Sequence, residues 1–141
     1  MFGKILLAYD GSKHSVKAAE YAVRLAQLDN SKIDLLHVRD SIHSYSNRVV
    51  YDKVALEELL IKDSEKILAK GLEIFKSAGI EVSSKILAGD AAELICDEAD
   101  KNNYSLVIMG SRGLNPVSRF VLGSVATKVL NCVKSPILIV K

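Results

Sequence analysis

The chain has 141 residues, of which 49% are apolar and 26% are charged, and this balance is that of a soluble globular protein with its own core. The net charge is only +2 and the basic residues are spread along the chain, which argues against a nucleic-acid interface. No apolar run is long enough to span a membrane, and the N-terminus leads straight into a strand-like run without signal-peptide architecture. We therefore expect one domain over residues 1–141, in the cytoplasm, with no membrane or nucleic-acid partner.

Strand-like and helix-like runs alternate along the chain. Short apolar runs indicate strands buried on both faces, and apolar residues three and four apart indicate helices. In chain order the expected elements are a strand at residues 5–9, a helix at about 12–28, a strand at 33–38, a polar loop at 39–52, a helix at about 54–78, a strand at 82–88, a helix at about 91–101, a strand at 106–109, a helix at about 124–133 and a strand at 136–140. This alternation requires parallel pairing through right-handed crossovers. The predicted fold is α/β and Rossmann-like: an open, doubly wound, mostly parallel five-stranded sheet with helices on both faces.

Local signals support some of these bounds. Gly79 is expected to end the long helix as the residue after its C-cap. Asp90 and Glu93 are expected to form a capping box at the start of the next helix. The polar stretch 39–52 is long enough to form a mobile lid over a site.

Few residues indicate catalysis or metal binding. Cys96 and Cys132 stand far apart, and neither has a second cysteine or a histidine at metal-ligand spacing. Both are interpreted as small helix residues of the core or its edge. His37 lies in an apolar run and is interpreted as a hydrogen-bonded histidine of the core or rim. The sequence shows no paired carboxylates and no Ser/His/Asp set, so no catalytic or metal-ligating residue is assigned.

The most informative motif is Gly110-Ser111-Arg112-Gly113, followed after nine residues by Gly123-Ser124. It connects an apolar strand-like run to a helix-like run. Glycines let the backbone approach an anion, and the first N–H groups of a helix are unpaired and favour negative charge. The motif therefore predicts a nucleotide polyphosphate site between Gly110 and Thr127. It equally fits a glycine turn before a helix with Ser124 as an ordinary N-cap, and it matches neither the P-loop nor the Gly-x-Gly-x-x-Gly pattern.

The predicted topology places a second candidate residue near this motif. Ligands of open α/β sheets bind beyond the carboxyl ends of the strands, where the strand order reverses. The first and fourth strands are expected to be neighbours at that point, which brings Asp10 into the same crevice as the glycines. Asp10 also fits an N-cap of the first helix. The sequence therefore leaves two roles open for Asp10, a ligand contact and a helix cap.

Five segments carry a family resemblance: Ile5-Leu6-Leu7-Ala8-Tyr9-Asp10-Gly11-Ser12, Leu36-His37-Val38, Gly89-Asp90-Ala91-Ala92-Glu93-Leu94-Ile95, Met109-Gly110-Ser111-Arg112-Gly113 with Gly123-Ser124-Val125-Ala126, and Ser135-Pro136-Ile137-Leu138-Ile139-Val140. Together they resemble the universal stress protein family over residues 5–140. That family contains members that bind ATP and members that do not, and the glycine pattern here is similar to that of the ATP-binding branch. Ala8 and Ala91 stand where the family often has proline, which changes loop stiffness rather than ligand chemistry.

The resemblance implies a position in an ATP site for each matching residue. The positions at the adenine end are Ala8, Asp10 and Val38, those under the ribose and the first phosphate are Met109 and Gly110, and those along the phosphate chain are Arg112, Gly113, Gly123, Ser124 and Val125, with a further contact from Thr127. Arg112 stands at a variable position of the family, so it also fits a solvated loop arginine. Mg²⁺ would accompany the phosphates rather than occupy a protein cage.

The resemblance further implies a regulatory stress-response protein that acts as a nucleotide-dependent homodimer. The expected dimer pairs the apolar edge strand Ile137–Val140 of two copies, and a downstream protein partner responds to the nucleotide. Two alternatives stand beside this one. They are an ATP-independent protein–protein interaction module of the same family, and a slow or partner-dependent ATPase of the wider nucleotide-hydrolase-like group. The retained glycines disfavour the first, and the lack of a Ser-Gly-Gly or His-x-Gly-His motif disfavours the second.

Overall fold

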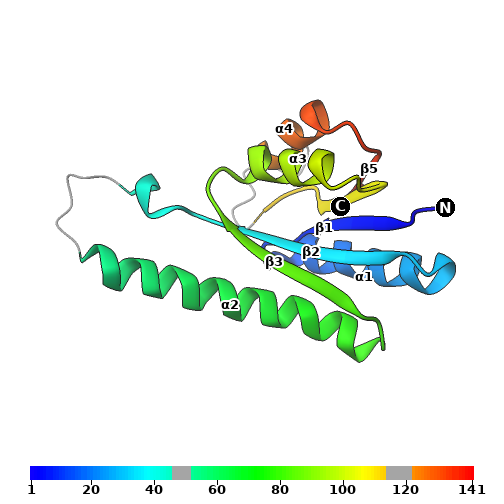
Figure 1. Ribbon diagram of the computed structural model, residues 1–141, viewed down its shortest axis with the longest axis horizontal. Helices are drawn as coiled ribbons and strands as arrows, with labels where there is room; N and C mark the ends of the chain where they lie inside the picture. Colours follow the sequence, from blue (N-terminus) through cyan, green and yellow to red (C-terminus); the bar gives the residue numbers. More distant parts are fainter. Residues whose placement is uncertain (46–51, 114–121) are drawn as a thin grey trace.

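The computed structural model of the protein describes residues 1–45, 52–113 and 122–141. Five parallel strands form one sheet in the order β3-β2-β1-β4-β5 with helices on both faces (Figure 1), which confirms the predicted fold. In chain order the elements are β1 (Lys4–Ala8), α1 (Lys13–Asp29), β2 (Lys32–Arg39), the 3₁₀ turn η1 (Ile42–Ser44), α2 (Lys53–Ser77), β3 (Val82–Ala88), α3 (Ala91–Lys101), β4 (Leu106–Gly110), α4 (Ser124–Cys132) and β5 (Ile137–Val140). The helix and strand bounds agree with the predicted ones to about one residue.

Two apolar layers hold the sheet between its helices. α1 and α2 cover one face, and α3 and α4 cover the other (Figure 1). Because side chains alternate along a strand, Ile5 and Leu7 of β1 pack in the layer of α1 and α2, while Leu6 packs in the layer of α3 and α4. Every position of β1 from Ile5 onward is therefore buried, as its continuous apolar run predicted.

The strand order reverses between β1 and β4. The chain first places β2 and β3 on one side of β1, and then returns to pair β4 with the other side. The connection after β1 leads to α1 on one face, and the connection after β4 leads to α4 on the opposite face. Two connections that leave in opposite directions open a crevice beyond the carboxyl ends of the strands. The predicted pairing of the first and fourth strands is confirmed.

The local signals are also found where they were expected. The Asp90 carboxylate accepts the Glu93 N–H at 2.9 Å and caps α3, which is one half of the predicted capping box; the return bond from the Asp90 N–H to the Glu93 carboxylate is not found among the described residues. Gly79 follows the C-cap of α2 with a φ of 71°, the left-handed conformation that glycine adopts without strain. The predicted polar loop at 39–52 contains η1, and residues 46–51 of the lid expected there lie outside the described residues.

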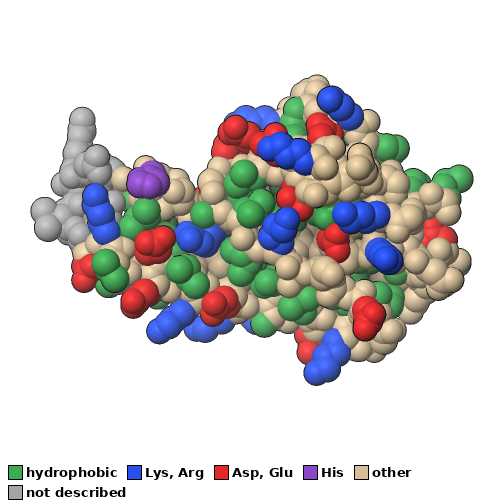
Figure 2. All heavy atoms as spheres, viewed as in Figure 1, with side chains coloured by type: hydrophobic (Ala, Val, Ile, Leu, Met, Phe, Trp, Pro, Cys, Tyr) green, Lys and Arg blue, Asp and Glu red, His purple; other side chains and the backbone are tan. Residues whose placement is uncertain are grey.

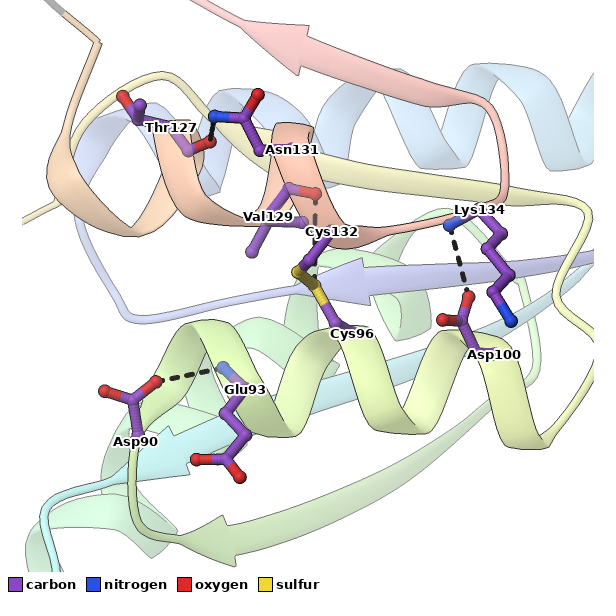
Figure 3. Close-up of a disulfide and its surroundings, with 9 residues drawn as sticks. All are labelled: Asp90, Glu93, Cys96, Asp100, Thr127, Val129, Asn131, Cys132 and Lys134. Atoms are coloured by element: carbon purple, nitrogen blue, oxygen red, sulfur yellow. Dashed lines mark hydrogen bonds between the residues drawn. A yellow bond between two sulfur atoms is a disulfide. The ribbon is translucent and has the colours of Figure 1, made fainter.

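A disulfide joins Cys96 of α3 to Cys132 at the end of α4 (Figure 3). The interpretation of both as small helix residues of the core or its edge holds for Cys96 but is wrong for Cys132, which is exposed, and it did not include the bond between them. They are 36 positions apart in the sequence, but α3 and α4 pack on the same face of the sheet, and the two Cα atoms lie 6.2 Å apart. That separation is usual for a protein disulfide. Cys96 is buried, whereas Cys132 is exposed.

The surface carries charges of both signs. Lys and Arg side chains are mixed with Asp and Glu over the face shown in Figure 2, and they form no separate basic patch there. α2 also exposes apolar side chains at Val54, Leu59 and Ile61. No helix in the described ranges combines the length and the apolar character needed to cross a membrane.

Gly110 ends β4 at a point where the strand touches the first turn of α1. A Cβ at Gly110 would lie 2.7 Å from the His14 Cβ, 2.8 Å from the His14 carbonyl carbon and 3.0 Å from the Ser15 N. Two of these neighbours are backbone atoms, which a side-chain rotation cannot move. The glycine of the motif is therefore required for packing of the sheet against α1.

We expect Gly110→Ala to lower the free energy of unfolding by about 1–3 kcal/mol, as overpacking of a core does. Gly3→Ala is the matched control, because a Cβ there meets nothing within 4 Å, and its effect should stay within about 0.5 kcal/mol. Urea unfolding of both variants measures the difference. Equal stability of Gly110→Ala and the wild type would contradict the packing role.

Asp29 ties the N-terminus of the chain to the end of α1. Its carboxylate accepts the Phe2 N–H at 3.1 Å and the Ser31 N–H at 3.1 Å, and the Ser31 hydroxyl also contacts it. The hydrogen bond from the Ser31 hydroxyl, followed by that from the Phe2 N–H, lowers the pKa of Asp29 to about 2. A carboxyl with a lowered pKa in the folded state stabilises the protein above the unfolded pKa, and this contribution is lost as the pH falls through the folded value.

Wild-type protein should therefore lose stability between pH 4 and about pH 2 in a way that Asp29→Asn does not, because the amide does not titrate. Unfolding curves of both proteins over this pH range test the expectation. Asp63→Asn, a change at an exposed site of α2, should keep the wild-type pH dependence. If the stability of wild type and of Asp29→Asn changed with pH in the same way, the stabilising role of the Asp29 carboxylate would be refuted.

Candidate functional site

A cavity of about 570 Å³ opens at the carboxyl ends of β1, β2 and β4, where the strand order reverses. This volume suits a small organic ligand. The described residues that line it are Ala8, Tyr9, Asp10, Ser15, Leu36, Val38, Ala91, Ile95, Met109, Gly110, Arg112, Gly113, Leu122, Gly123, Ser124, Val125 and Ala126. The cavity thus joins parts of the chain that are as far apart in the sequence as β1 and α4.

Much of the cavity wall is apolar. Ala8, Leu36, Val38, Ile95 and Met109 contribute to it from three strands and from α3. The same side chains belong to the apolar layer between the sheet and α3 and α4, or pack against it. The cavity is therefore an opening at the end of that layer, and its walls suit an aromatic ring better than a charged group.

The main chain of Val38 adds polar groups to this apolar region. Leu36 faces β1, and its carbonyl accepts the Tyr9 N–H at 2.9 Å. Val38 is the next residue on the same side of β2, but β1 ends at Ala8. Since alternate residues of a parallel strand direct N–H and C=O to the same neighbour, those groups of Val38 point into the space beyond β1. They are placed to hydrogen-bond the edge of a ring in the cavity.

α4 begins at the cavity without a side-chain cap. Its N-cap is Gly123, and no side chain in the described part of the chain bonds its first turn. The first helical N–H bond is that of Thr127 to the Gly123 carbonyl at 3.0 Å, so the N–H groups of Ser124, Val125 and Ala126 have no partner within the helix. All three residues line the cavity. Unpaired N–H groups at the positive end of a helix dipole form a site for an anion.

A main-chain hydrogen bond closes the glycine motif into a loop. The Gly123 N–H donates to the Ser111 carbonyl at 2.8 Å, which places the start of α4 beside the end of β4. A Cβ at Gly123 would lie 3.3 Å from the Arg112 Cα and 3.3 Å from the Ser111 oxygen. A Cβ at Gly113 would lie 3.1 Å from the Asp10 Oδ2. Neither glycine has a positive φ, so close packing rather than backbone conformation favours glycine at these two positions.

Asp10 lines the cavity at the end of β1. Its Oδ1 accepts the Ser12 N–H at 2.9 Å across a turn in which Gly11 adopts a φ of 83°. The N-cap of α1 is Ser12, whose hydroxyl accepts the Ser15 N–H at 3.2 Å. The alternative in which Asp10 caps the first helix is therefore wrong. Its second carboxylate oxygen lies against Gly113, so Asp10 joins the β1 end to the glycine loop.

His37 and Tyr9 hold the turn that carries Asp10. The His37 Nδ1 lies 2.8 Å from the Tyr9 carbonyl and donates to it, because a carbonyl oxygen only accepts. Both residues are buried, which agrees with the interpretation of His37 as a hydrogen-bonded core histidine. Burial, followed by the neighbouring Asp10 carboxylate, raises the pKa of the Tyr9 hydroxyl. Tyr9 therefore stays neutral at physiological pH.

The cavity lining carries one acidic and one basic side chain among the described residues, Asp10 and Arg112. Arg112 is partly buried, and its Cα lies next to Gly123 at the start of α4. The positive groups are thus at the α4 side, where the helix dipole also favours an anion. Within residues 1–45, 52–113 and 122–141, no three His, Cys, Asp or Glu side chains lie close enough to hold a metal ion.

The cavity contains all of the predicted site residues except Thr127, whose hydroxyl donates to the Gly123 carbonyl at 2.9 Å instead. The alternative with Ser124 as the N-cap is wrong, since Gly123 occupies that position. Sequence reasoning missed the following lining residues: Tyr9, Ser15, Leu36, Ala91, Ile95, Leu122 and Ala126. Several of them belong to the apolar faces of predicted strands and helices, and only the packing of those faces shows which positions border the opening.

Comparison with known proteins gives the family. The sequence matches the universal stress protein family over residues 1–141. The chain belongs to the universal stress protein family. Universal stress protein YxiE of Bacillus subtilis is 33% identical to it over 150 residues, with 100% of both chains covered. A universal stress protein of Thermus aquaticus is 31% identical over 142 residues, again with 100% of both chains covered.

Solved structures of the family share the fold. The hypothetical protein MJ0577 superimposes with a TM-score of 0.85 at 26% identity, covering 100% of this chain and 96% of the other. The universal stress protein from Archaeoglobus fulgidus in complex with dAMP gives 0.73 at 19% identity, covering 100% and 98%. A family protein from Arabidopsis thaliana with AMP bound gives 0.71 at 20% identity, covering 98% and 90%. At these last two identities the likeness concerns the fold alone.

Proposed function

We propose that this universal stress protein binds ATP in the cavity between β1 and β4. The start of α4 carries the proposal, because three N–H groups there have no partner among the described residues and border a cavity whose other walls are apolar. A nucleotide has the matching division into an aromatic base and an anionic chain. The base would lie against the apolar walls near Val38, and the phosphates would lie at Ser124 and Val125.

The ligands of related proteins favour an adenine nucleotide. dAMP in the Archaeoglobus protein and AMP in the Arabidopsis protein both contain adenine and a phosphate. Extension to a triphosphate rests on this chain's own groups, because the start of α4 and the Arg112 side chain are two separate positive groups in the cavity lining. Mg²⁺ would bind through the phosphate oxygens, since it commonly keeps water and substrate ligands.

The proposed role is regulatory and cytoplasmic, with ATP controlling contact with a downstream protein. Hydrolysis requires a group that orients water at the terminal phosphate. Among the described lining residues Asp10 is the one carboxylate, and its Oδ1 already accepts the Ser12 N–H. A slow or partner-dependent ATPase is the alternative. Phosphate release, measured on the ATP-containing samples of the titration described next, distinguishes this ATPase from a regulatory protein that only binds ATP.

Isothermal titration with ATP, ADP and AMP, with and without Mg²⁺, tests the site. Affinity should fall as phosphates are removed, because each lost phosphate gives up contacts with the start of α4. A sample is first denatured and checked for nucleotide carried through purification. Absence of binding, with no nucleotide released on denaturation, would instead support the ATP-independent interaction module.

Substitution of the loop glycines localises the binding. Gly113→Val and Gly123→Val should each abolish ATP binding while the protein remains folded, because a valine side chain would intrude on Asp10 or on the Ser111–Arg112 backbone at the cavity wall. Gly3→Val is the matched control, since a Cβ there meets nothing within 4 Å, and it should bind as the wild type does. Circular dichroism reports the fold. Wild-type affinity in both loop variants would place the nucleotide elsewhere.

We also propose that two copies pair through β5, which is the edge strand of the sheet beside β4. The carbonyls of Pro136 and Val140 accept N–H groups of the β4 side, from Val107 and Ser111. Ile137 and Ile139 therefore direct their main-chain groups outward, where a two-fold related β5 can pair with them. Their side chains pack against the layer of α3 and α4.

Ile139→Pro removes an outward N–H but no N–H of the β4–β5 ladder, and edge strands tolerate such a proline. We expect a dimeric wild type and a monomeric, folded variant in analytical ultracentrifugation at equal concentration. An unchanged sedimentation coefficient for Ile139→Pro, or a wild type that is itself monomeric, would argue against pairing through β5.

A further inference from the structure

The disulfide connects the two helices that border the cavity on one face of the sheet. Cys96 immediately follows Ile95, which lines the cavity from α3. Cys132 is the last residue of α4, and the first residues of that helix, Ser124 and Val125, line the cavity at its anionic side. Figure 3 shows the bond crossing from α3 to α4. A covalent bond thus holds together two walls of the proposed nucleotide site.

α4 is a short helix that is held by tertiary contacts as well as by the disulfide. It has nine residues, of which Ala126 and Val129 are buried in the apolar layer that it shares with α3. At its start, the Gly123 N–H is bonded to Ser111. Beyond its end, the Lys134 N–H donates to Asp100 of α3 at 3.2 Å in an exposed hydrogen bond (Figure 3). A helix this short depends on such tertiary contacts, and the covalent bond to α3 adds to them at its C-terminal end.

The two sulfurs have different surroundings. Cys132 is exposed at the end of α4, where a small thiol can reach it. Cys96 is 6% exposed, and its Sγ lies 3.9 Å from the Val129 carbonyl, which offers an acceptor to the thiol that forms there on reduction. After reduction, the Cys96 thiol can therefore donate to the Val129 carbonyl and the Cys132 thiol can be solvated. Reduction of the disulfide then leaves no buried polar atom without a partner.

We propose that Cys96 and Cys132 form a reversible thiol–disulfide exchange site for small thiols of the glutathione class. Its oxidation state controls how firmly α4 is held against α3, and through α4 it controls the affinity of the cavity for ATP. The second part rests on the proposed nucleotide site, and the first part rests on the proposed cytoplasmic location but not on nucleotide binding. In a cytoplasm kept reducing by such thiols, a disulfide between two cysteines of a protein is usually transient and redox-sensing rather than structural.

The exchange consists of two balanced steps. A small thiolate attacks the Cys132 Sγ, the bond to Cys96 breaks, and its electron pair stays on the Cys96 sulfur, which takes a proton from water. A second small thiolate then attacks the small-molecule sulfur of the mixed disulfide and releases the Cys132 thiolate. Two small thiols are oxidised to one small disulfide, and the protein disulfide is reduced to two thiols. The reverse reaction with the small disulfide restores the bond.

The test equilibrates the full chain with reduced or with oxidised glutathione, quenches a sample by alkylation, and counts free thiols by intact mass. Amide hydrogen exchange of residues 124–132 and ATP titration are measured on each form. We expect reduction to speed exchange in α4 and to weaken ATP binding by about fivefold or more, the lower end of usual coupling between sites. Oxidised glutathione should restore both values.

Cys132→Ser is the matched variant, because it removes the thiol of an exposed residue without opening the core and leaves Cys96, which is buried. Its amide exchange in α4 and its ATP affinity should equal those of the reduced wild type in both glutathione buffers. A change of either value with the buffer in Cys132→Ser, with no mixed disulfide in its intact mass, would overturn the inference.

The remaining outcomes separate the two proposals. Amide exchange of residues 124–132 that is the same in both forms overturns the inference whether or not ATP binds. Equal ATP affinity of the two forms overturns the coupling to the cavity. Absence of ATP binding in both forms overturns the proposed function, while the thiol count and the amide exchange still decide whether the site controls α4.

Discussion

The hydrogen bond from the Gly123 N–H to the Ser111 carbonyl fixes the geometry on which the site depends. It returns the chain to the end of β4 after an excursion of eleven residues, so that α4 starts beside the strand that it follows. The absence of a Cβ at Gly113 and Gly123 then allows backbone, Asp10 carboxylate and helix start to share a very small space.

The cavity itself follows from the way in which the sheet is wound. β1 and β4 are neighbours, but α1 and α4 leave them toward opposite faces. Their apolar side chains fill both layers of the core, and the layer of α3 and α4 ends in an opening where β1 has stopped and β2 continues. The main-chain groups of Val38 and those at the start of α4, which have no partner among the described residues, result from the same termination of secondary structure. Beside Asp10 and Arg112, the polar groups of the site are thus backbone groups at the ends of a strand and a helix.

Apolar packing and covalent bonding play different parts in the two layers. α1 is a long helix that contacts β4 closely at Gly110, and its alanines are buried against the sheet. α4 is short, and its link to α3 includes the disulfide between Cys96 and Cys132. The layer of α1 and α2 lies on one face of the sheet, while α3 and α4, which border the cavity on the other face, are joined by a bond that thiols can break. In the proposed exchange, the site would change while the opposite layer keeps its contacts.

The sequence by itself determined the order and bounds of the strands and helices, because apolar periodicity and caps such as Asp90 are local features of the chain. The pairing of the first and fourth strands followed from the alternation of elements and the handedness of their connections. The glycine motif and Asp10 pointed to the carboxyl ends of the strands, where the cavity lies. The disulfide, the N-caps at Ser12 and Gly123, and the lining role of Ile95 were decided only by the tertiary structure. Each depends on distances between residues far apart in the chain, or on which of several adjacent polar groups takes a cap, and periodicity carries no information on either. The same holds for Gly110, which the sequence marks as a glycine before a helix and which only the approach of α1 makes necessary for packing.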